Sequence, residues 1–167
     1  MRQLEEKQAV MEANMKELLG REASSTTVVN NNLIFLNFGN EDMSHVQPPL
    51  QYLEKAFDGL RELLNDVYFN NNMPQNNTIR INIAKNTAEV RYSDGWKAVA
   101  VLEAASKMIG KCGFYMLSAY DSERHKENDK VMEFGFSLQN PGFGRTASIT
   151  TDIHHKLLLR ACESFIE

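Results

Sequence analysis

The stretch that decides the fold is IRINIAKNTAEVRY, residues 79–92, in which apolar and polar side chains alternate on both sides of Lys85-Asn86. Alternation with a period of two residues is typical of a β-hairpin that buries one face. We therefore expect one hairpin at about residues 78–92. Its buried rows are predicted to be Ile79, Ile81 and Ile83 on the first strand and Ala88, Val90 and Tyr92 on the second.

The polar face of this hairpin carries two arginines, Arg80 and Arg91. Both point outward by the same alternation and form a small positive ribbon, and a β-ribbon can enter a DNA groove. Glu89 and Asp94 lie nearby, however, and charges on strands also prevent edge-to-edge aggregation. The net charge of −4 argues further against a protein that binds nucleic acid over its whole surface. Arg80 and Arg91 are therefore candidates for a partner surface, on which nucleic acid is not the favoured partner.

A helical period dominates the apolar sequence that follows Pro48-Pro49, so the predicted fold class is α+β and mainly helical. Trp96 follows the tight turn at Ser93-Asp94-Gly95 and is the predicted aromatic anchor between the hairpin and the helices. The predicted helices lie at about residues 50–69, 98–111 and 130–139, with a last one capped by Thr146 or Ser148. Gly110 or Gly113 is expected to end the second of these helices.

The first 22 residues predict a coiled-coil helix. Their apolar positions follow the 4-3-4-3 spacing of a left-handed coiled-coil seam, with Glu and Lys between them. A helix this short is marginal alone, so it needs a surface, either on its own domain or on another copy. The strict seam, without the wider stripe of a docked helix, favours self-association as a dimer or trimer. The predicted oligomerisation residues are Leu4, Met11, Met15 and Leu18.

Three parts are predicted along the chain. Residues 1–22 form the coiled-coil oligomerisation helix, residues 23–47 an Asn-rich strand and connector, and residues 48–167 a globular helical domain that contains the hairpin. The short strand, at about residues 33–38, is an apolar run that is prone to aggregate unless it is covered. It can pair between chains or pack under the helical bundle.

Groups with reactive or metal-binding chemistry are isolated from one another in the sequence. His154-His155 are adjacent, whereas two metal ligands on a helix prefer the spacing i and i+4. Cys112 and Cys162 lie in apolar helical contexts without a CxxC partner, which is typical of buried, unreactive thiols. Glu41-Asp42 is more typical of a turn than of a cation site, and the loop at residues 140–145 lacks the Lys of a P-loop. We predict a non-enzymatic protein without catalytic, metal or cofactor-binding residues.

Composition narrows the class of protein further. A chain of 167 residues that is 43% hydrophobic and 24% charged is typical of one soluble domain with an appendage. Its apolar runs are shorter than the roughly 20 residues of a membrane helix, and its first residues lack the apolar core of a signal peptide. Two cysteines fit a reducing compartment. We expect an intracellular protein that does not bind a membrane.

Two phrases of the sequence carry a resemblance to a family of proteins. They are NNNLIFLNFGNEDMSHV at residues 30–46 and VYFNNNMPQNNTIRINIAKNTAEVRYSDGWK at residues 67–97. Together they resemble proteins encoded by large DNA viruses of eukaryotes, including giant viruses. In that family a coiled coil leads into an Asn-rich strand, followed by a helical domain with a hairpin. The likeness covers about residues 27–111 well and the later helices loosely. The matching residues are Asn37, Phe38, Gly39, Asn40, Glu41 and Asp42, then Phe69, Asn70, Pro74, Asn76, Asn77 and Ile79, and finally Trp96.

This resemblance implies a virus-encoded intracellular protein with an oligomerising domain. Together with the predicted seam, it leads us to expect a homo-oligomeric interaction or assembly protein whose partners, besides itself, are viral or host proteins. It acts in the infected cell, in the cytoplasm, viral factory or nucleus, or is packaged in the virion. Longer members often carry an N-terminal zinc finger, which implies nucleic-acid contact for those members. The present chain has no cysteine before Cys112, so that role does not carry over by matching residues. A nucleic-acid-associated regulatory protein is the alternative.

Overall fold

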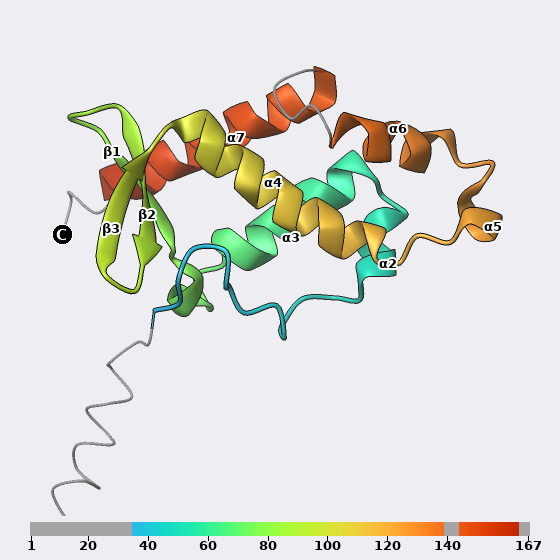
Figure 1. The fold of residues 1–167 in the computed structure, drawn as a ribbon, viewed down its shortest axis with the longest axis horizontal. Coiled ribbons are helices and arrows are strands. Elements are labelled where there is room, and N and C mark those ends of the chain that lie inside the picture. The colour runs from blue at the N-terminus through green and yellow to red at the C-terminus, as the bar shows by residue number, and fades with distance from the viewer. Residues whose placement is uncertain (1–34, 139–143, 164–167) are drawn as a thin grey trace, which may run out of the picture. The chain divides into compact units, whose positions relative to one another are not determined.

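The computed structural model describes residues 35–138 and 144–163. In these residues the fold is α+β, with six α-helices and one three-stranded antiparallel sheet in the order β1-β2-β3 (Figure 1). The mainly helical α+β class is therefore confirmed. The predicted coiled coil, with Leu4, Met11, Met15 and Leu18, lies outside the described residues. The elements are α2 (Pro49–Leu53), α3 (Phe57–Tyr68), η1 (Pro74–Asn76), β1 (Ile79–Asn82), β2 (Thr87–Tyr92), β3 (Gly95–Val99), α4 (Val101–Leu117), α5 (Ser122–His125), α6 (Asp129–Ser137) and α7 (Gly144–Glu163).

The predicted hairpin is formed by β1 and β2. Ile79 pairs with Val90 and Ile81 with Ala88, and all four side chains are buried on the inner face of the sheet. The prediction for Ile83 is wrong, because this residue follows the end of β1 and is 46% exposed. The alternating pattern thus identified the strands but extended the first of them too far.

A third strand, β3, corrects the prediction of a single hairpin. Its Trp96 pairs with Arg91 and its Ala98 with Glu89, so β2 becomes the central strand. Most residues of β3 are exposed, as is common for an edge strand, and GWKAV therefore lacks the alternation that marked the first two strands. Because β3 extends to Val99, the predicted helix at 98–111 begins only at Val101.

The predicted helix at 50–69 is two helices. α2 ends at Leu53 and α3 begins at Phe57, and Ala56 between them has a φ of 50°. A Cβ atom at Gly59 would overlap the carbonyl oxygen of Tyr52, so glycine is what allows α3 to pass this close to α2. The apolar period continues through the break because the residues on both sides are buried.

The remaining helices are confirmed with changed bounds. α4 does not stop at Gly110 or Gly113 but runs to Leu117, and the Leu138 side chain fills the space that a side chain at Gly113 would occupy. The segment at 130–139 is largely α6. α7 begins at Gly144, so Thr146 lies buried within its first turn and is not a cap.

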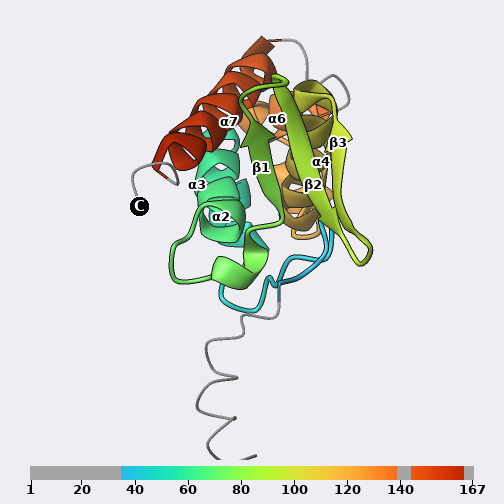
Figure 2. The same cartoon turned by 90° about the vertical axis from the view of Figure 1, so that its left-hand side faces the viewer.

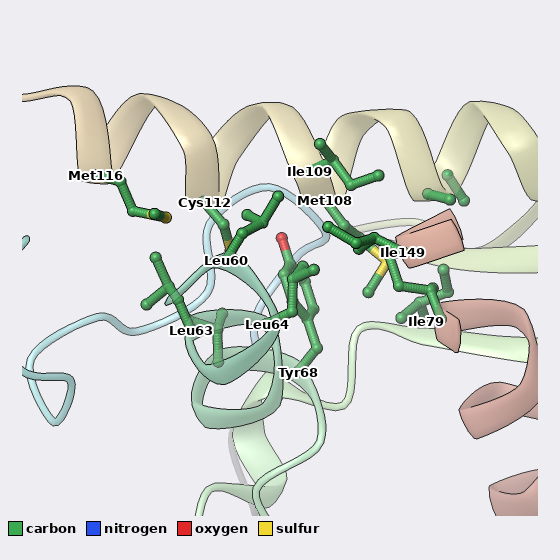
Figure 3. Close-up of a cluster of buried hydrophobic side chains, with 14 of the residues drawn as sticks. Leu60, Leu63, Leu64, Tyr68, Ile79, Met108, Ile109, Cys112, Met116 and Ile149 are labelled. Carbon is green, nitrogen blue, oxygen red and sulfur yellow. The ribbon is translucent and has the colours of Figure 1, made fainter. Parts of the chain in front are cut away.

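The core lies between the inner face of the sheet and α3, α4 and α7. Figure 3 shows the leucines of α3 pointing at the apolar face of α4, with Ile79 of β1 and Ile149 of α7 closing the cluster beside them. In the described part of the chain, no helix has the length and apolar character needed to cross a membrane. The fully buried side chains that form the centre are Leu60, Leu63, Tyr68, Ile79, Met108, Ile109, Met116, Ile149 and Leu157.

A buried polar cluster ties the segment before α2 to this core. The Glu41 carboxylate, whose side chain is fully buried, forms an ion pair of 2.6 Å with Lys111 of α4 and accepts a hydrogen bond of 2.5 Å from Thr78. It also accepts hydrogen bonds from the Tyr68 hydroxyl at 3.3 Å and the Gly39 backbone N–H at 2.9 Å. Burial and the Glu41 charge raise the pKa of Tyr68. We call these five residues the Glu41 cluster.

The two phrases that carry the family resemblance meet next to the Glu41 cluster. The side-chain amide of Asn76 accepts from the Asp42 backbone N–H at 2.8 Å and donates to the Asp42 carbonyl at 2.9 Å. The Asp42 carboxylate accepts from the Ser44 backbone N–H, which makes the predicted turn. These residues therefore hold the fold together, with Glu41 paired to Lys111 and Asp42 bound in the turn.

Candidate functional site

Arg80 and Arg91 lie on the outer face of the sheet, where the alternation placed them, and Trp96 lies there too. The guanidinium carbon of Arg80 is 4.2 Å from the centroid of the Trp96 ring, and that of Arg91 is 5.6 Å away. The prediction of Trp96 as a core anchor is therefore wrong. Trp96 pairs with Arg91 across β2 and β3, and side chains of directly paired residues point to the same face of a sheet.

Phe35 extends this set of planar groups to the segment ahead of the domain. Its ring centroid is 4.3 Å from the guanidinium carbon of Arg91, and its side chain is 38% exposed. The Phe38 backbone N–H donates to the Arg91 carbonyl at 2.7 Å, which holds the segment against the sheet. The part of the predicted 33–38 strand that is described, residues 35–38, has no strand conformation. Phe35, Arg91, Trp96 and Arg80 follow one another in space, and we call them the arginine–aromatic row.

The row opens into a groove of about 530 Å³ beside β1. Figure 2 looks onto the sheet with α4 behind it and α7 next to β1. The far wall of the groove is the last part of α7, where Leu157, Arg160 and Ala161 line it. Residues far apart in the sequence therefore form one recess on the outer side of the sheet.

The charges in this groove are unevenly paired. Glu89 accepts hydrogen bonds of 2.8 Å from Arg80 and 3.2 Å from Asn82. The hydrogen bond from Asn82, followed by that from Arg80, lowers the pKa of Glu89. Within residues 35–138 and 144–163, Arg91 has no carboxylate partner. Among the described residues, the groove thus holds a neutralised pair next to a cation without a carboxylate partner.

Arg160 is the third arginine of the groove. Its Nη2 donates to the Tyr68 carbonyl at 2.6 Å, and its guanidinium carbon lies 4.9 Å from the centroid of the Phe69 ring. Its Nη1 is buried and finds no hydrogen-bond partner among the described residues. Burial lowers the pKa of this guanidinium, but the group stays charged because arginine is not deprotonated in proteins. A buried donor without an acceptor costs free energy, so this end of the groove favours a ligand that supplies an oxygen.

Among the described residues, metal-binding side chains and cysteine thiols do not converge on this groove. In the described part of the chain, no three His, Cys, Asp or Glu side chains are placed to hold a metal ion. Burial raises the pKa of the Cys112 thiol, as expected for an unreactive cysteine, whereas Cys162 is exposed, contrary to its prediction. What the groove offers is stacking surfaces and hydrogen-bond donors, which serve binding.

Sequence reasoning identified two residues of this site and missed three. Arg80 and Arg91 followed from the alternation in β1 and β2. The position of Trp96 could have been predicted from the sequence. A tight turn after a strand predicts a partner strand, and paired residues on the two strands lie on the same face of the sheet. Phe35 and Arg160 come from segments distant in sequence, and their place depends on tertiary packing.

Comparisons of the chain with protein-family models, with curated proteins and with solved structures find no match. The geometry of the groove and the pattern of the sequence are therefore the basis for a function.

Proposed function

We propose that the protein is a non-enzymatic, homo-oligomeric interaction protein, encoded by a virus, that binds its partner on the arginine–aromatic row. The observation that carries the proposal is the place of Trp96, between two arginines on the outer face of the sheet and not in the core. Tryptophan and arginine are the residues most enriched where binding energy concentrates. Burying a tryptophan inside would have served stability, so its outward place supports a role in binding.

Self-association increases the number of binding faces that one assembly presents to a partner. The seam predicted at residues 1–22 holds two or three copies together, and each copy presents its own row. A partner with repeated sites then binds several faces at once, and weak contacts add up through the high effective concentration. The family resemblance supports a place for this assembly in the infected cell or the virion.

The oligomeric state of the full chain tests this proposal. Light scattering on the wild type is expected to give the mass of a dimer or trimer, and the double variant Met11→Glu, Met15→Glu the mass of one chain, because charge cannot be buried in the seam. Met132→Glu, at a 40% exposed methionine of α6, is the matched control and should leave the mass unchanged. A wild-type protein that remains a single chain at high concentration contradicts the oligomer.

The alternative, a nucleic-acid-associated regulatory protein, is favoured by one specific observation. Arg91 and Arg160 lie in the groove without a carboxylate partner among the described residues. Cations that are left unpaired next to aromatic rings are suited to an anionic, planar partner.

A further inference from the structure

We propose that the arginine–aromatic row binds single-stranded nucleic acid, with unpaired bases stacked against the row and phosphates bound by Arg91 and Arg160. The inference rests on the proposed function, because it names the partner of the same face. Three features of the groove carry it: the order of the planar groups in space, the balance of charge, and the donor of Arg160 that has no partner among the described residues.

The planar groups alternate between rings and guanidinium ions. From Phe35 to Arg91 the separation is 4.3 Å, from Arg91 to Trp96 5.6 Å, and from Trp96 to Arg80 4.2 Å. Unpaired bases stack on aromatic rings and on guanidinium planes, and they do so without regard to sequence because every base has a π face. The row therefore brings two rings and two guanidinium groups together, and these are the kinds of group on which unpaired bases stack.

The charge of the groove differs from the charge of the chain. Its walls include three arginines, Arg80, Arg91 and Arg160, and one carboxylate, Glu89, although the chain as a whole carries a net charge of −4. Glu89 is already held by Arg80, so the two other arginines remain for an anion. The local excess of positive charge attracts a phosphate backbone, while the rest of the surface does not compete for it.

The hydrogen-bond donor of Arg160 favours one chemical class of partner. Arg160 lines the far wall of the groove, where its Nη2 donates to the Tyr68 carbonyl and its Nη1 finds no hydrogen-bond partner among the described residues. A phosphate oxygen satisfies such a fixed donor, whereas an apolar partner would leave it unpaired. Phosphate bound there and at Arg91 leaves the attached bases next to the rings of the row.

Two other partners fit the observations less well. In a duplex the faces of the bases are covered by their neighbours, so the rings of the row would have nothing to stack on. An acidic peptide would use the arginines but would gain little from Trp96 and Phe35. Both are outcomes of the test.

Trp96 is the only tryptophan of the chain, so its fluorescence reports directly on the row. The full-length protein is titrated with oligo(dT) and oligo(U) of about 20 nucleotides, a length that covers any single site. Stacking of a base is expected to quench the fluorescence. With two phosphate contacts, raising the salt from about 50 to 200 mM should weaken binding about sevenfold. The comparison ligands are a duplex of the same length, poly-glutamate and inorganic polyphosphate.

Three variants separate charge from stacking. Arg91→Gln should weaken binding at least about fivefold, and Glu89→Gln should strengthen it by a similar factor, because one removes a cation and the other an anion from the groove. Phe35→Leu removes a ring and no charge, and should also weaken binding about fivefold. The matched control is Arg124→Gln on α5, where the arginine pairs with Glu54 outside the groove. Circular dichroism at the titration temperature checks that each variant is folded.

Several results would overturn the inference. One is the absence of quenching at low salt. Another is a duplex, poly-glutamate or polyphosphate that binds as tightly as oligo(dT). A third is a loss of affinity in Arg124→Gln equal to that in Arg91→Gln. The light-scattering result is independent of all of them. If the protein is an oligomer but binds no single strand, this inference is disproved, and the oligomeric protein must have another partner. If the protein is a single chain that binds the strand, the inference holds and the proposed oligomer is disproved.

Discussion

The Glu41 cluster and the arginine–aromatic row are both built from charged groups of distant segments, but they differ in how far their hydrogen bonds are satisfied. Glu41 is fully buried and is held by four donors from α3, α4, the start of β1 and its own turn. In the row, Phe35 is exposed and Arg91 is half-buried, and in the groove Arg160 keeps a donor unpaired among the described residues.

This difference separates stability from binding within one small domain. A buried network in which every group is paired is rigid, and removing one member leaves a charge without compensation. An exposed network that is only partly paired adds little to stability, because water already solvates its members, and it leaves donors for a ligand. We therefore expect substitutions in the cluster to change unfolding and substitutions in the row to change binding.

The largest effect is expected for Glu41→Gln. The amide removes the ion pair with Lys111 and part of the hydrogen bonding to Thr78, at a side chain that is fully buried. Breaking a buried pair costs about 3 kcal/mol, which lowers the melting temperature by roughly 9 °C in a domain of this size. Thermal unfolding followed by circular dichroism measures the change.

The control for Glu41→Gln is Glu103→Gln, which breaks an exposed i,i+4 pair with Lys107. It should change the free energy of unfolding by less than about 0.5 kcal/mol. Equal losses for the two variants would contradict the distinction between the cluster and exposed pairs.

The second largest effect is expected for Gly59→Ala. The new methyl group would overlap the Tyr52 carbonyl, and overpacking of this kind costs about 2 kcal/mol. Gly110→Ala is the control, since no atom lies within 4 Å of its Cβ position in α4. It should stabilise the helix by about 0.5 kcal/mol. Because neither glycine touches the row, both variants should bind a partner as the wild type does, and a change in binding would show that the row depends on overall stability.

The same two regions mark how far the sequence predicts this fold. Period two revealed β1 and β2, and with them Arg80 and Arg91, because each strand has one buried and one exposed face. The break between α2 and α3 was invisible, since the apolar pattern continues through Ala56, and β3 was missed because most of this edge strand is exposed. The Glu41 cluster depends on contacts between residues up to 72 positions apart, which no local pattern contains.

A smaller effect, with a pH dependence, is expected for Tyr52→Phe. The Tyr52 hydroxyl donates to the Asp66 carboxylate at 2.7 Å and accepts from the Gln47 backbone N–H at 3.1 Å. Burial, with the bond to Asp66, raises the pKa of Tyr52 to about 12. The folded state therefore keeps the proton between about pH 10 and 12 while the unfolded state loses it, so this contribution is complete below pH 10 and falls as the pH rises.

Urea unfolding at neutral pH and near pH 11 tests this prediction. The variant should be less stable by about 1 kcal/mol at neutral pH, through the loss of the hydrogen bonds, and the difference should shrink at the higher pH. Tyr120→Phe is the control, as this tyrosine is 39% exposed and its hydroxyl contacts only the Met132 sulfur at 3.5 Å among the described residues. A difference between wild type and Tyr52→Phe that does not depend on pH would disprove the role of the retained proton.

The smallest effect on stability is expected for Glu89→Gln, in the groove beside the row. Hydrogen bonds from Asn82 and Arg80 lower the pKa of Glu89, so its contribution is present above the ordinary pKa of 4.5 and is lost as the pH falls through the lowered value. An ion pair on the sheet surface is worth about 0.5 kcal/mol, so urea unfolding near pH 7 should separate wild type and variant by about this much, and the difference should shrink as the pH falls below 4.5. A loss as large as that of Glu41→Gln would place Glu89 among the residues that hold the fold, and the row would then be a structural network like the cluster.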